Sequence, residues 1–292
     1  MKQFNYRKLN QHNMNITIIG MGLIGGSMAL GLKKAGIAKK IIAVDGNEEH
    51  ARQALKLGLA DEAKNLEEAV KQSNIIILAV PVNAAEKILP VILNNIENQV
   101  VLDAGSTKET VCSIAEKHAK GGRFVATHPM WGTEFSGPTA AVEDAFKGKA
   151  VVFCNKENSD EDALKQAEEI YSTLGMHTIY MDAKAHDLHA AYISHVSHIT
   201  SFALANTVLE KEKEDDKIFE MASGGFESTV RLAKSNAAMW VPIFMQNREN
   251  VLDVLNEHIS QLRKFKSCLE KENYEYLEEL IVNANKIKRI LK

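Results

Sequence analysis

The chain of 292 residues is long enough for two domains or one large one, and its 45% hydrophobic and 25% charged residues are typical of a soluble globular protein. Its formal net charge of −3 gives no reason to expect nucleic acid or an acidic membrane as a partner. The three cysteines are odd in number and fit no metal-binding pattern, so we expect reduced thiols and a cytoplasmic protein.

The first organised stretch of the chain follows a polar segment. Residues 1–13 lack periodicity, and we expect them to form a flexible tail. Residues 16–45 then read as a short apolar strand, a glycine cluster, a helix and a second apolar strand that ends on an acid. Gly20, Gly22 and Gly25 form the pattern G-x-G-x-x-G between the first strand and the helix, which is the order that a dinucleotide site requires.

Each part of this pattern has a physical role at such a site. The first glycine permits the tight turn, the second lets the backbone approach a pyrophosphate, and the third lets helix and strand pack closely. The first helical residues, Leu23 and Ile24, offer free N–H groups and a partial positive charge to the phosphates. Asp45 lies 20 residues beyond Gly25, where a carboxylate accepts hydrogen bonds from ribose hydroxyls and favours NAD over NADP.

Two other interpretations of residues 16–45 are weaker. Glycine-rich turns occur in many α/β proteins, but here the turn joins a strand to a helix and the acid has the expected spacing. A signal or membrane segment would use the uncharged run 16–32, which is shorter than the roughly 20 residues of a spanning helix. That run also contains five glycines and is not followed by an A-x-A cleavage site. We therefore predict an NAD site.

From residue 45 to residue 181, short apolar runs alternate with helical segments. The predicted helices are 48–57, 66–72, 110–119 and 160–174, and the predicted strands are 74–81, 100–105, 123–127, 149–154 and 178–181. This alternation favours a mostly parallel, doubly wound Rossmann-type sheet with right-handed crossovers. Ligands of such sheets bind at the carboxyl ends of strands, which points to the loops after Ile19, Val80, Asp103 and Thr127.

Beyond residue 182 no convincing strand is predicted and the pattern becomes helical. The predicted helices are 185–213, 216–222, 227–235, 237–270 and 274–291. We therefore expect a nucleotide-binding domain over residues 14–181 and an all-helical domain over residues 182–292.

Two residues stand at predicted strand ends where the cofactor is expected. Ser106 follows a buried strand within the sequence DAGSTK, although on residue type alone a helix cap by Ser106 or Thr107 is the stronger interpretation. A cap and an active-site hydroxyl can be the same residue. His128 follows the next predicted strand. Such a histidine alone is more often a satisfied loop residue than a catalyst, but the ordinary pKa of histidine lies near neutrality, so a histidine at that edge can act as a general base.

The predicted helix 185–213 is rich in histidine. It carries His186, His189, His195 and His198. Ser194 lies four residues before His198, so both can face one ligand. The spacing of His195 and His198 is compatible with a metal site. No H-E-x-x-H pattern or carboxylate partner accompanies it, however, and we expect no metal. For His186 and His189 we prefer a solvated face or a helix-packing contact.

One arginine follows a pair of glycines in the helical region, in the sequence SGGFESTVRLA. Arg231 is suited to bind a carboxylate through two parallel hydrogen bonds, although a single helical arginine more often makes a surface ion pair. We expect Trp240 and Gln246 to be core and interhelix residues unless the fold brings them to the same pocket.

Taken together, these motifs resemble the prephenate dehydrogenase family, the dehydrogenases of tyrosine biosynthesis. The matching pieces run in family order through both domains: GMGLIGGSMA (20–29), Asp45, AVP (79–81), DAGSTK (103–108), HPMWGTEFSGP (128–138), SHVSH (194–198), GGFESTVRLA (224–233) and MW (239–240). The pieces HPM-GTE and GGF…R-A are specific, whereas many oxidoreductases share the glycine pattern.

The resemblance implies a role for each matched position. His128 matches the catalytic histidine that assists deprotonation of the ring hydroxyl of prephenate, and Ser106 matches the serine that orients this histidine and the substrate. Arg231 matches the arginine that holds a substrate carboxylate. The other matches in the substrate pocket are Ser194, His198, Thr133 and Glu134, and those at the cofactor are Val80 and Pro81 with the glycine segment.

The activity implied is NAD-dependent oxidative decarboxylation of prephenate to 4-hydroxyphenylpyruvate, in a homodimer formed by the helical domain. Two departures from the family pattern affect the pocket. Residues 227–230 read Glu-Ser-Thr-Val where the family more often has an arginine, an aspartate and a threonine, and Trp131 stands where a small residue is common. No βαββαβ regulatory domain follows, so we expect no control by such a domain.

Several alternatives stay open at this point. An arogenate or dual-specificity cyclohexadienyl dehydrogenase would differ from a prephenate dehydrogenase in its contacts near the substrate side chain. The sequence does not identify those contacts. A β-hydroxyacid dehydrogenase or imine reductase has a similar domain order, but those enzymes use a lysine in the helical domain or another loop signature, and HPMWGTE speaks against them. A dinucleotide-sensing dimer without turnover is the non-enzymatic alternative.

Overall fold

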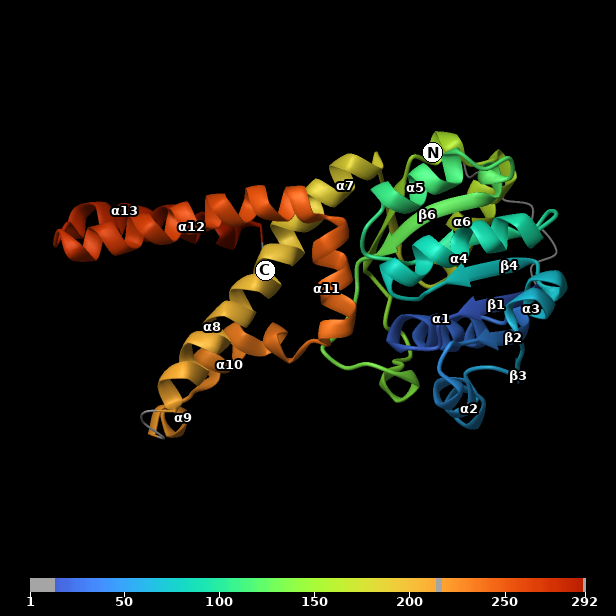
Figure 1. The fold of residues 1–292 in the computed structure, drawn as a ribbon, viewed down its shortest axis with the longest axis horizontal. Coiled ribbons are helices and arrows are strands. Elements are labelled where there is room, and N and C mark those ends of the chain that lie inside the picture. The colour runs from blue at the N-terminus through green and yellow to red at the C-terminus, as the bar shows by residue number, and fades with distance from the viewer. Residues whose placement is uncertain (1–13, 214–216, 291–292) are drawn as a thin grey trace, which may run out of the picture.

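The computed structural model describes residues 14–213 and 217–290, which form a covered sheet and an arm of helices (Figure 1). The tail expected over residues 1–13 lies outside the described residues, as do residues 291 and 292. The helices of the arm lie along one side of the sheet and extend away from it. The two parts contact each other through α7 (Ala183–Ala190) and α11 (Ala237–Gln246), so the molecule has one boundary region to which both contribute.

One sheet with the strand order β3-β2-β1-β4-β5-β6-β7-β8 forms the centre of the first part. Its strands are β1 (Met14–Ile19), β2 (Ala38–Val44), β3 (Glu62–Ala63), β4 (Ile75–Leu78), β5 (Val100–Asp103), β6 (Phe124–Pro129), β7 (Ala150–Cys154) and β8 (His177–Met181). All neighbouring strands are parallel except β6 and β7, which are antiparallel. Because β2 and β4 flank β1 on opposite sides, the order reverses there and opens a crevice at the carboxyl ends of β1 and β4.

Helices cover both faces of this sheet. They are α1 (Leu23–Lys34), α2 (Glu48–Lys56), α3 (Leu66–Gln72), α4 (Val82–Asn95), α5 (Glu109–Glu116) and α6 (Glu161–Thr173), with 3-10 turns at Gly121–Arg123, Pro138–Ala140 and Lys156–Asn158. One cluster of buried side chains joins α1 and α6 to the sheet, and a second joins α3, α4 and α5 to the opposite face. The predicted fold class is therefore confirmed for this part.

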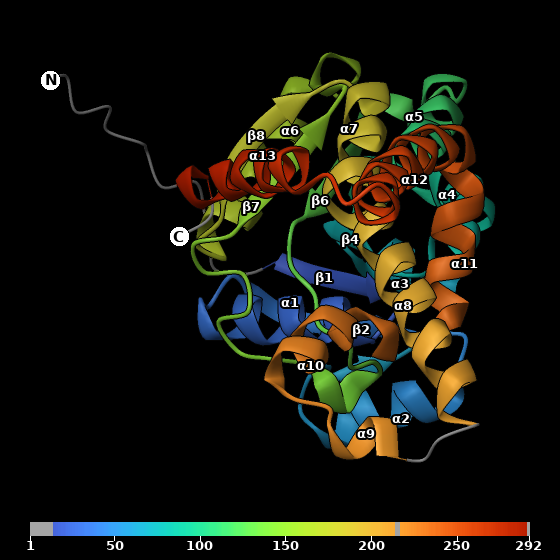
Figure 2. The same cartoon turned by 90° about the vertical axis from the view of Figure 1, so that its left-hand side faces the viewer.

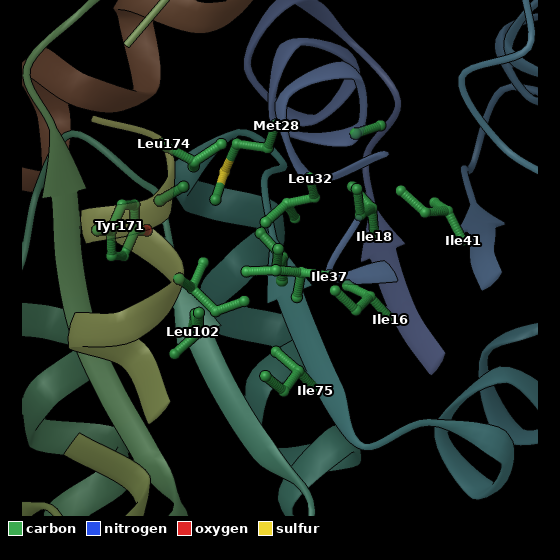
Figure 3. Packing of buried hydrophobic residues seen from close by; sticks show 14 of the residues in the cluster. Ile16, Ile18, Met28, Leu32, Ile37, Ile41, Ile75, Leu102, Tyr171 and Leu174 are labelled. Atoms are coloured by element: carbon green, nitrogen blue, oxygen red, sulfur yellow. The ribbon is translucent and has the colours of Figure 1, made fainter. Parts of the chain in front are cut away.

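The strands read as nearly continuous apolar runs because both of their faces are buried. Side chains alternate between the faces along a strand, so Ile16 and Ile18 of β1 belong to the first cluster and Ile19 belongs to the second. Figure 3 shows the first cluster, in which Met28 and Leu32 of α1 lie toward the isoleucines of the strands. This packing fixes the strand ends that carry the polar loops.

The helical part continues directly from β8. Its elements are α7, a π-helical turn (Ala191–His195), α8 (Val196–Glu212), α9 (Lys217–Glu220), α10 (Gly224–Val230), a 3-10 turn (Arg231–Lys234), α11, α12 (Arg248–Glu270), α13 (Tyr274–Ala284) and a final 3-10 turn (Asn285–Arg289). In Figure 2, turned by 90°, α7, α8 and α11 lie in front of the sheet. The predicted all-helical character is confirmed, and 14–181 and 182–292 stay our proposed domain limits.

Three elements of the structure differ from the sequence prediction. The predicted helix 237–270 is broken at Asn247, whose buried side-chain amide donates to the carbonyl oxygen of Asp187 at 2.6 Å. The predicted helix 185–213 contains the π-helical turn. Helix α4 was not predicted because Pro90 lies inside it, and proline lacks the N–H that a helix interior needs.

Large apolar side chains stay exposed on the outer helices. Leu262 and Leu269 of α12 are 55% and 67% exposed, and Ile281 and Val282 of α13 are 49% and 57% exposed. Large exposed apolar side chains grouped on neighbouring helices are typical of a protein interface. Within the described residues, no helix combines the length and apolar character needed to cross a bilayer.

Candidate active site

The glycine loop lies at the carboxyl end of β1 and has the geometry of a phosphate cradle. Gly20 has φ +94°, and a Cβ there would collide with the carbonyl oxygen of Ala79. A Cβ at Gly25 would collide with the backbone of Gly20. At Gly22, by contrast, a Cβ would meet no protein atom within 4 Å. Two glycines are therefore needed for packing, and the middle one faces open space where a pyrophosphate can approach.

Asp45 lies beside this loop at the end of β2. Its Oδ2 accepts a hydrogen bond from the backbone N–H of Met21 at 2.8 Å, and its Oδ1 accepts one from Asn47 at 2.9 Å. The carboxylate is thus held in place, and its remaining lone pairs can receive ribose hydroxyls. Helix α1 begins without a side-chain cap at Gly22, so its first N–H groups, including those of Leu23 and Ile24, point at the cradle. These residues fit NAD.

The loop after β4 connects the cradle to the helical domain. Val80 lies next to Gly20, and Pro81 precedes the first residue of α4. Val82 at the start of α4 packs against Trp240 of α11. The side chain of Gln246, at the end of α11, donates to the carbonyl oxygen of Val82 at 3.1 Å. The wall on which a nicotinamide would lie is therefore shared between the domains.

Ser106 lies in the loop after β5 and does not cap α5. The expected side-chain cap is wrong, because α5 begins after Lys108 and its first N–H groups are bound from the helical domain. Asp187 of α7 accepts the N–H of Lys108 at 2.8 Å and that of Glu109 at 3.0 Å. Thr107 instead donates its hydroxyl to Gln246 at 2.7 Å. The Ser106 hydroxyl makes no hydrogen bond with the described residues, so it is available to a ligand.

His128, in β6, begins a chain of hydrogen bonds that crosses the domain boundary. Its Nδ1 lies 2.8 Å from Nε2 of His186, and Nδ1 of His186 lies 2.7 Å from Oδ1 of Asp187. A carboxylate accepts only, so His186 carries its proton on Nδ1 and His128 donates from Nδ1. The other ring nitrogen of His128, Nε2, is then an unprotonated acceptor, as a general base requires.

Burial keeps both rings neutral. It lowers the pKa of His128 well below the ordinary value of 6.5, and the neighbouring His186 and Lys108 lower it further. Burial also lowers the pKa of His186, although its bond to Asp187 opposes this shift. Neutral rings are the state that the hydrogen-bond directions require.

A second histidine of the helical domain is oriented by its own helix. His198 of α8 donates from Nδ1 to the backbone oxygen of Ser194 at 2.9 Å, which leaves its Nε2 as an acceptor. Its ring stacks on Trp240 with centroids 3.5 Å apart, and burial lowers its pKa. The Trp240 indole N–H is buried without a hydrogen-bond partner among the described residues. Ser194, His198 and Trp240 therefore lie at one corner of the domain boundary.

The loop after β6 reaches the helical domain through an ion pair. Arg231 donates to Oε2 of Glu134 at 3.1 Å, with 51% and 18% of the two side chains exposed. Thr133 next to it accepts the N–H of Phe135 at 3.3 Å. Trp131 points elsewhere, because its ring packs edge-on against Phe146 with centroids 5.4 Å apart. This tryptophan, which departs from the family pattern, therefore packs against the core and not against the ion pair.

Two family models match the chain in succession. Residues 28–180 match "Prephenate dehydrogenase, nucleotide-binding domain", and residues 182–283 match "Prephenate dehydrogenase, dimerization domain". The chain belongs to the prephenate dehydrogenase family. The family match and the geometry meet at the same place, because the cradle, the histidines and the Glu134–Arg231 pair all lie where the two matched domains face each other.

Individual relatives agree with this membership. The prephenate dehydrogenase of Bacillus subtilis (strain 168) is 33% identical over 273 residues, which cover 92% of this chain and 74% of that protein. The cyclohexadienyl dehydrogenase of Zymomonas mobilis is 27% identical and is covered to 96%. The solved structure of Aquifex aeolicus prephenate dehydrogenase with hydroxyphenyl propionate and NAD+ has a TM-score of 0.86 and 30% identity, covering 95% of this chain and 97% of that one.

Two residues of the candidate site were not predicted from the sequence. His186 was expected on a solvated or packing face and no role was predicted for Asp187, yet together they connect His128 to the start of α5. The signal available was weak: an acid directly after a histidine at the predicted domain boundary. No group of three or more metal-binding side chains comes together within the described residues, so His195 and His198 do not form such a group there.

Proposed function

We propose that this chain is an NAD-dependent prephenate dehydrogenase that forms 4-hydroxyphenylpyruvate, carbon dioxide and NADH in tyrosine biosynthesis. The observation that carries the proposal is the neutral His128 at a strand end, which donates from Nδ1 toward Asp187 through His186 and leaves Nε2 free as a base. Family membership and the NAD+ complex of the Aquifex aeolicus relative support the choice of substrate and cofactor.

The cofactor would be held by residues of the first domain. Gly20, Gly22 and Gly25 with the N–H groups of Leu23 and Ile24 would bind the pyrophosphate, while Asp45 would bind the adenosine ribose. Val80 and Pro81 would lie along the nicotinamide. When bound, NAD+ accepts the hydride from the ring carbon that carries the substrate hydroxyl.

The proton is handled by His128. Its Nε2 accepts the hydroxyl proton as the hydride leaves, and the imidazolium that forms is stabilised through His186 by the carboxylate of Asp187. Ser106 would bind the same oxygen and keep it within reach of the ring. Loss of the ring carboxylate as carbon dioxide then returns an electron pair to the ring and to that oxygen, which takes the proton back. Aromatisation makes this step irreversible, so positioning is the protein's main task.

Prephenate carries two carboxylates, and the helical domain supplies the cation for one of them. Arg231 is half exposed and paired with Glu134, so its guanidinium keeps donors for a substrate carboxylate. Ser194, His198 and Thr133 line the proposed pocket around it. Binding there would join both domains through the substrate as well as through the ion pair.

A second copy of the chain and a reducing compartment complete the proposal. The exposed apolar faces of α12 and α13 fit a homodimer, in agreement with the match to a dimerization domain. Cys112, Cys154 and Cys268 are unpaired and buried, which suits the cytoplasm. We propose a cytoplasmic homodimer that acts on a small molecule.

The test is a paired assay of the purified protein with prephenate and with arogenate, each with NAD+ and with NADP+. We expect NADH formation with prephenate, with 4-hydroxyphenylpyruvate identified as product by chromatography. Turnover of arogenate instead, or of both substrates, would make the enzyme an arogenate or cyclohexadienyl dehydrogenase. If neither substrate yields reduced cofactor although NADH binds, the chain is a dinucleotide-binding protein and the proposal fails.

A further inference from the structure

A buried ion pair lies directly beneath the proposed catalytic groups. The side chain of Lys108 is completely buried, and its ammonium donates to the carboxylate of Asp103 and to the carbonyl oxygen of Thr127, the latter at 2.8 Å. Asp103 is itself only 1% exposed. A buried ion pair is weak evidence for stability, since apolar side chains of similar volume are often as stable or more so. Its presence here calls for another explanation.

The ion pair closes the loop that carries Ser106. Asp103 ends β5 and Lys108 precedes α5, so the bond between their side chains joins the two ends of the loop. Oδ1 of Asp103 also accepts the N–H of Gly105 at 3.0 Å, which fixes the residue before Ser106. The backbone that carries Ser106 is therefore held by this carboxylate and this ammonium.

The same ammonium holds the backbone next to His128. The carbonyl oxygen of Thr127 belongs to the peptide bond that leads into His128, so the 2.8 Å bond from Lys108 fixes the strand at that point. The Thr127 hydroxyl binds the backbone oxygen of Asp103 and lies 2.6 Å from the Tyr171 hydroxyl. The carboxyl ends of β5 and β6 are thus tied together beside the serine and the histidine.

The backbone of Lys108 reaches the other side of the histidine. Its N–H donates to Oδ1 of Asp187 at 2.8 Å, and the same oxygen accepts from His186, which binds the ring of His128. A closed ring of hydrogen bonds results. It runs from the ammonium through Thr127 to His128, and from the ring of His128 through the helical domain back to the backbone of Lys108.

We propose that Lys108 is a positioning residue that holds Ser106, the backbone of His128 and the Asp187 carboxylate in one arrangement. This inference rests on the proposed function, because the groups that it positions are those of the proposed reaction. Lys108 itself touches neither reacting atoms nor substrate, since its side chain is enclosed beneath the loop. A misplacement of catalytic groups by about 1 Å lowers turnover on the order of a hundredfold.

The charge of Lys108 also acts on His128. The groups that influence the pKa of His128 are His186, Lys108 and His195, all of which lower it. The carboxylate of Asp103 is bound to Lys108, and the carboxylate of Asp187 is bound to His186. Removal of the ammonium alone leaves Asp103 uncompensated and raises the pKa of His128, so the acid limb of the rate profile moves to higher pH.

Two variants separate positioning from stability. Lys108→Met should lower kcat for prephenate by about 10- to 100-fold with an NAD+ affinity near that of the wild type, and it should move the acid limb upward. Lys108→Met with Asp103→Asn removes both charges and keeps an oxygen that accepts the N–H of Gly105, so thermal stability and the acid limb should return toward the wild type while kcat stays low. Lys71→Met, at an exposed ion pair with Glu67, is the matched control and should leave kcat, NAD+ affinity, the acid limb and thermal stability unchanged.

The outcomes decide between the possibilities. If the double variant recovers wild-type kcat together with its stability, Lys108 is merely structural and the inference is overturned; the same holds if the single variant keeps full turnover. Should the single variant not fold, the double variant alone decides. Failure of the wild-type enzyme to oxidise prephenate would instead overturn the proposed function, so the two failures are distinguishable.

Discussion

The two domains of this chain bury their apolar side chains to very different degrees. In the nucleotide-binding domain, two large clusters fill both faces of a covered sheet. Among the described residues of the helical domain, the clusters contain only three buried residues each, and one of these borrows Val82 from the other domain. Side chains such as Leu269 and Val282 stay more than half exposed.

This difference separates two ways of building a site. The nucleotide-binding domain has its own core, so its strand ends place the backbones of Ser106 and His128. The helical domain has little core of its own. Contacts with the first domain bring His186 and Arg231 to the site, while His198 is held by its own helix and by Trp240. A substitution at His128 should therefore affect chemistry, whereas substitutions at Arg231, on the outer face of α12 and at His195 should affect binding, assembly and acid stability.

The largest effect is expected at the base. His128→Asn keeps a donor toward His186 but removes the nitrogen that accepts the substrate proton. We expect kcat to fall by about 10²- to 10⁴-fold with NAD+ affinity unchanged, as measured by steady-state kinetics and cofactor titration. His118→Asn, a histidine that binds Asn94 on the same domain, is the control. Wild-type turnover in His128→Asn would remove this residue from the mechanism.

The next largest effect tests whether a second copy of the chain covers the exposed apolar face of the helical domain. Leu262→Glu with Leu269→Glu places charges on the exposed face of α12, and each leucine buried in a dimer contributes about 1.5–3 kcal/mol. We expect dimer dissociation to become at least about 100-fold easier, as measured by sedimentation across a concentration series. Leu57→Glu, at an exposed leucine of the first domain, should leave the dimer intact. An unchanged dimer in the double variant would place the interface elsewhere.

Removal of the substrate cation should have a moderate effect. Arg231→Ala removes donors for a carboxylate, and a hydrogen bond to a charged group contributes about 1.5–3 kcal/mol. We expect KM for prephenate to rise by about 10- to 100-fold with a smaller change in kcat. Arg248→Ala, at an exposed arginine paired with Glu249, is the control and should change neither. A fall in kcat at constant KM would assign Arg231 to the chemical step.

Cofactor preference should shift about tenfold or more at Asp45, since like charges held close together cost several kcal/mol. Asp45→Asn keeps a side-chain oxygen for the N–H of Met21 but removes the charge that repels the extra phosphate of NADP. The ratio of kcat/KM for NAD+ and NADP+ measures the change. A preference that does not move would mean that another residue selects the cofactor.

The smallest effect concerns acid stability. Burial lowers the pKa of His195 to about 4, so the unfolded chain binds this proton below about 6.5 and the folded chain does not. Stability from this group is present above pH 6.5 and is lost as the pH falls toward 4, by about 1 kcal/mol at one pH unit below 6.5. His195→Gln should lose less stability on acidification in denaturant unfolding, whereas His177→Gln, at an exposed histidine, should behave as the wild type. Parallel curves for wild type and His195→Gln would contradict this assignment.

The contrast between the domains also explains what the sequence could predict. The glycine loop, Asp45 and His128 follow apolar runs, and a strand covered on both faces ends where such a run ends. The succession of apolar runs and loops along the chain was therefore enough to predict the sheet and the edge where these residues lie. Helix α4 was missed because its internal proline resembles a stop signal.

Contacts between distant segments could not be predicted in this way. His186 meets His128 across 58 positions of sequence, and Asp187 replaces the local cap that was expected from Ser106 or Thr107. Asn247 breaks a strongly periodic helix because its buried amide binds the backbone of α7. Each of these residues has an ordinary local pattern, and its role follows from the packing of the helical domain onto the sheet.

A crystal structure with NAD+ and 4-hydroxyphenylpyruvate tests most directly whether both domains meet on one substrate. We expect the ring hydroxyl within hydrogen-bonding distance of Nε2 of His128 and of the Ser106 hydroxyl, with the carboxylate of the side chain on Arg231. A product bound entirely within one domain, or with its hydroxyl away from His128, would contradict it.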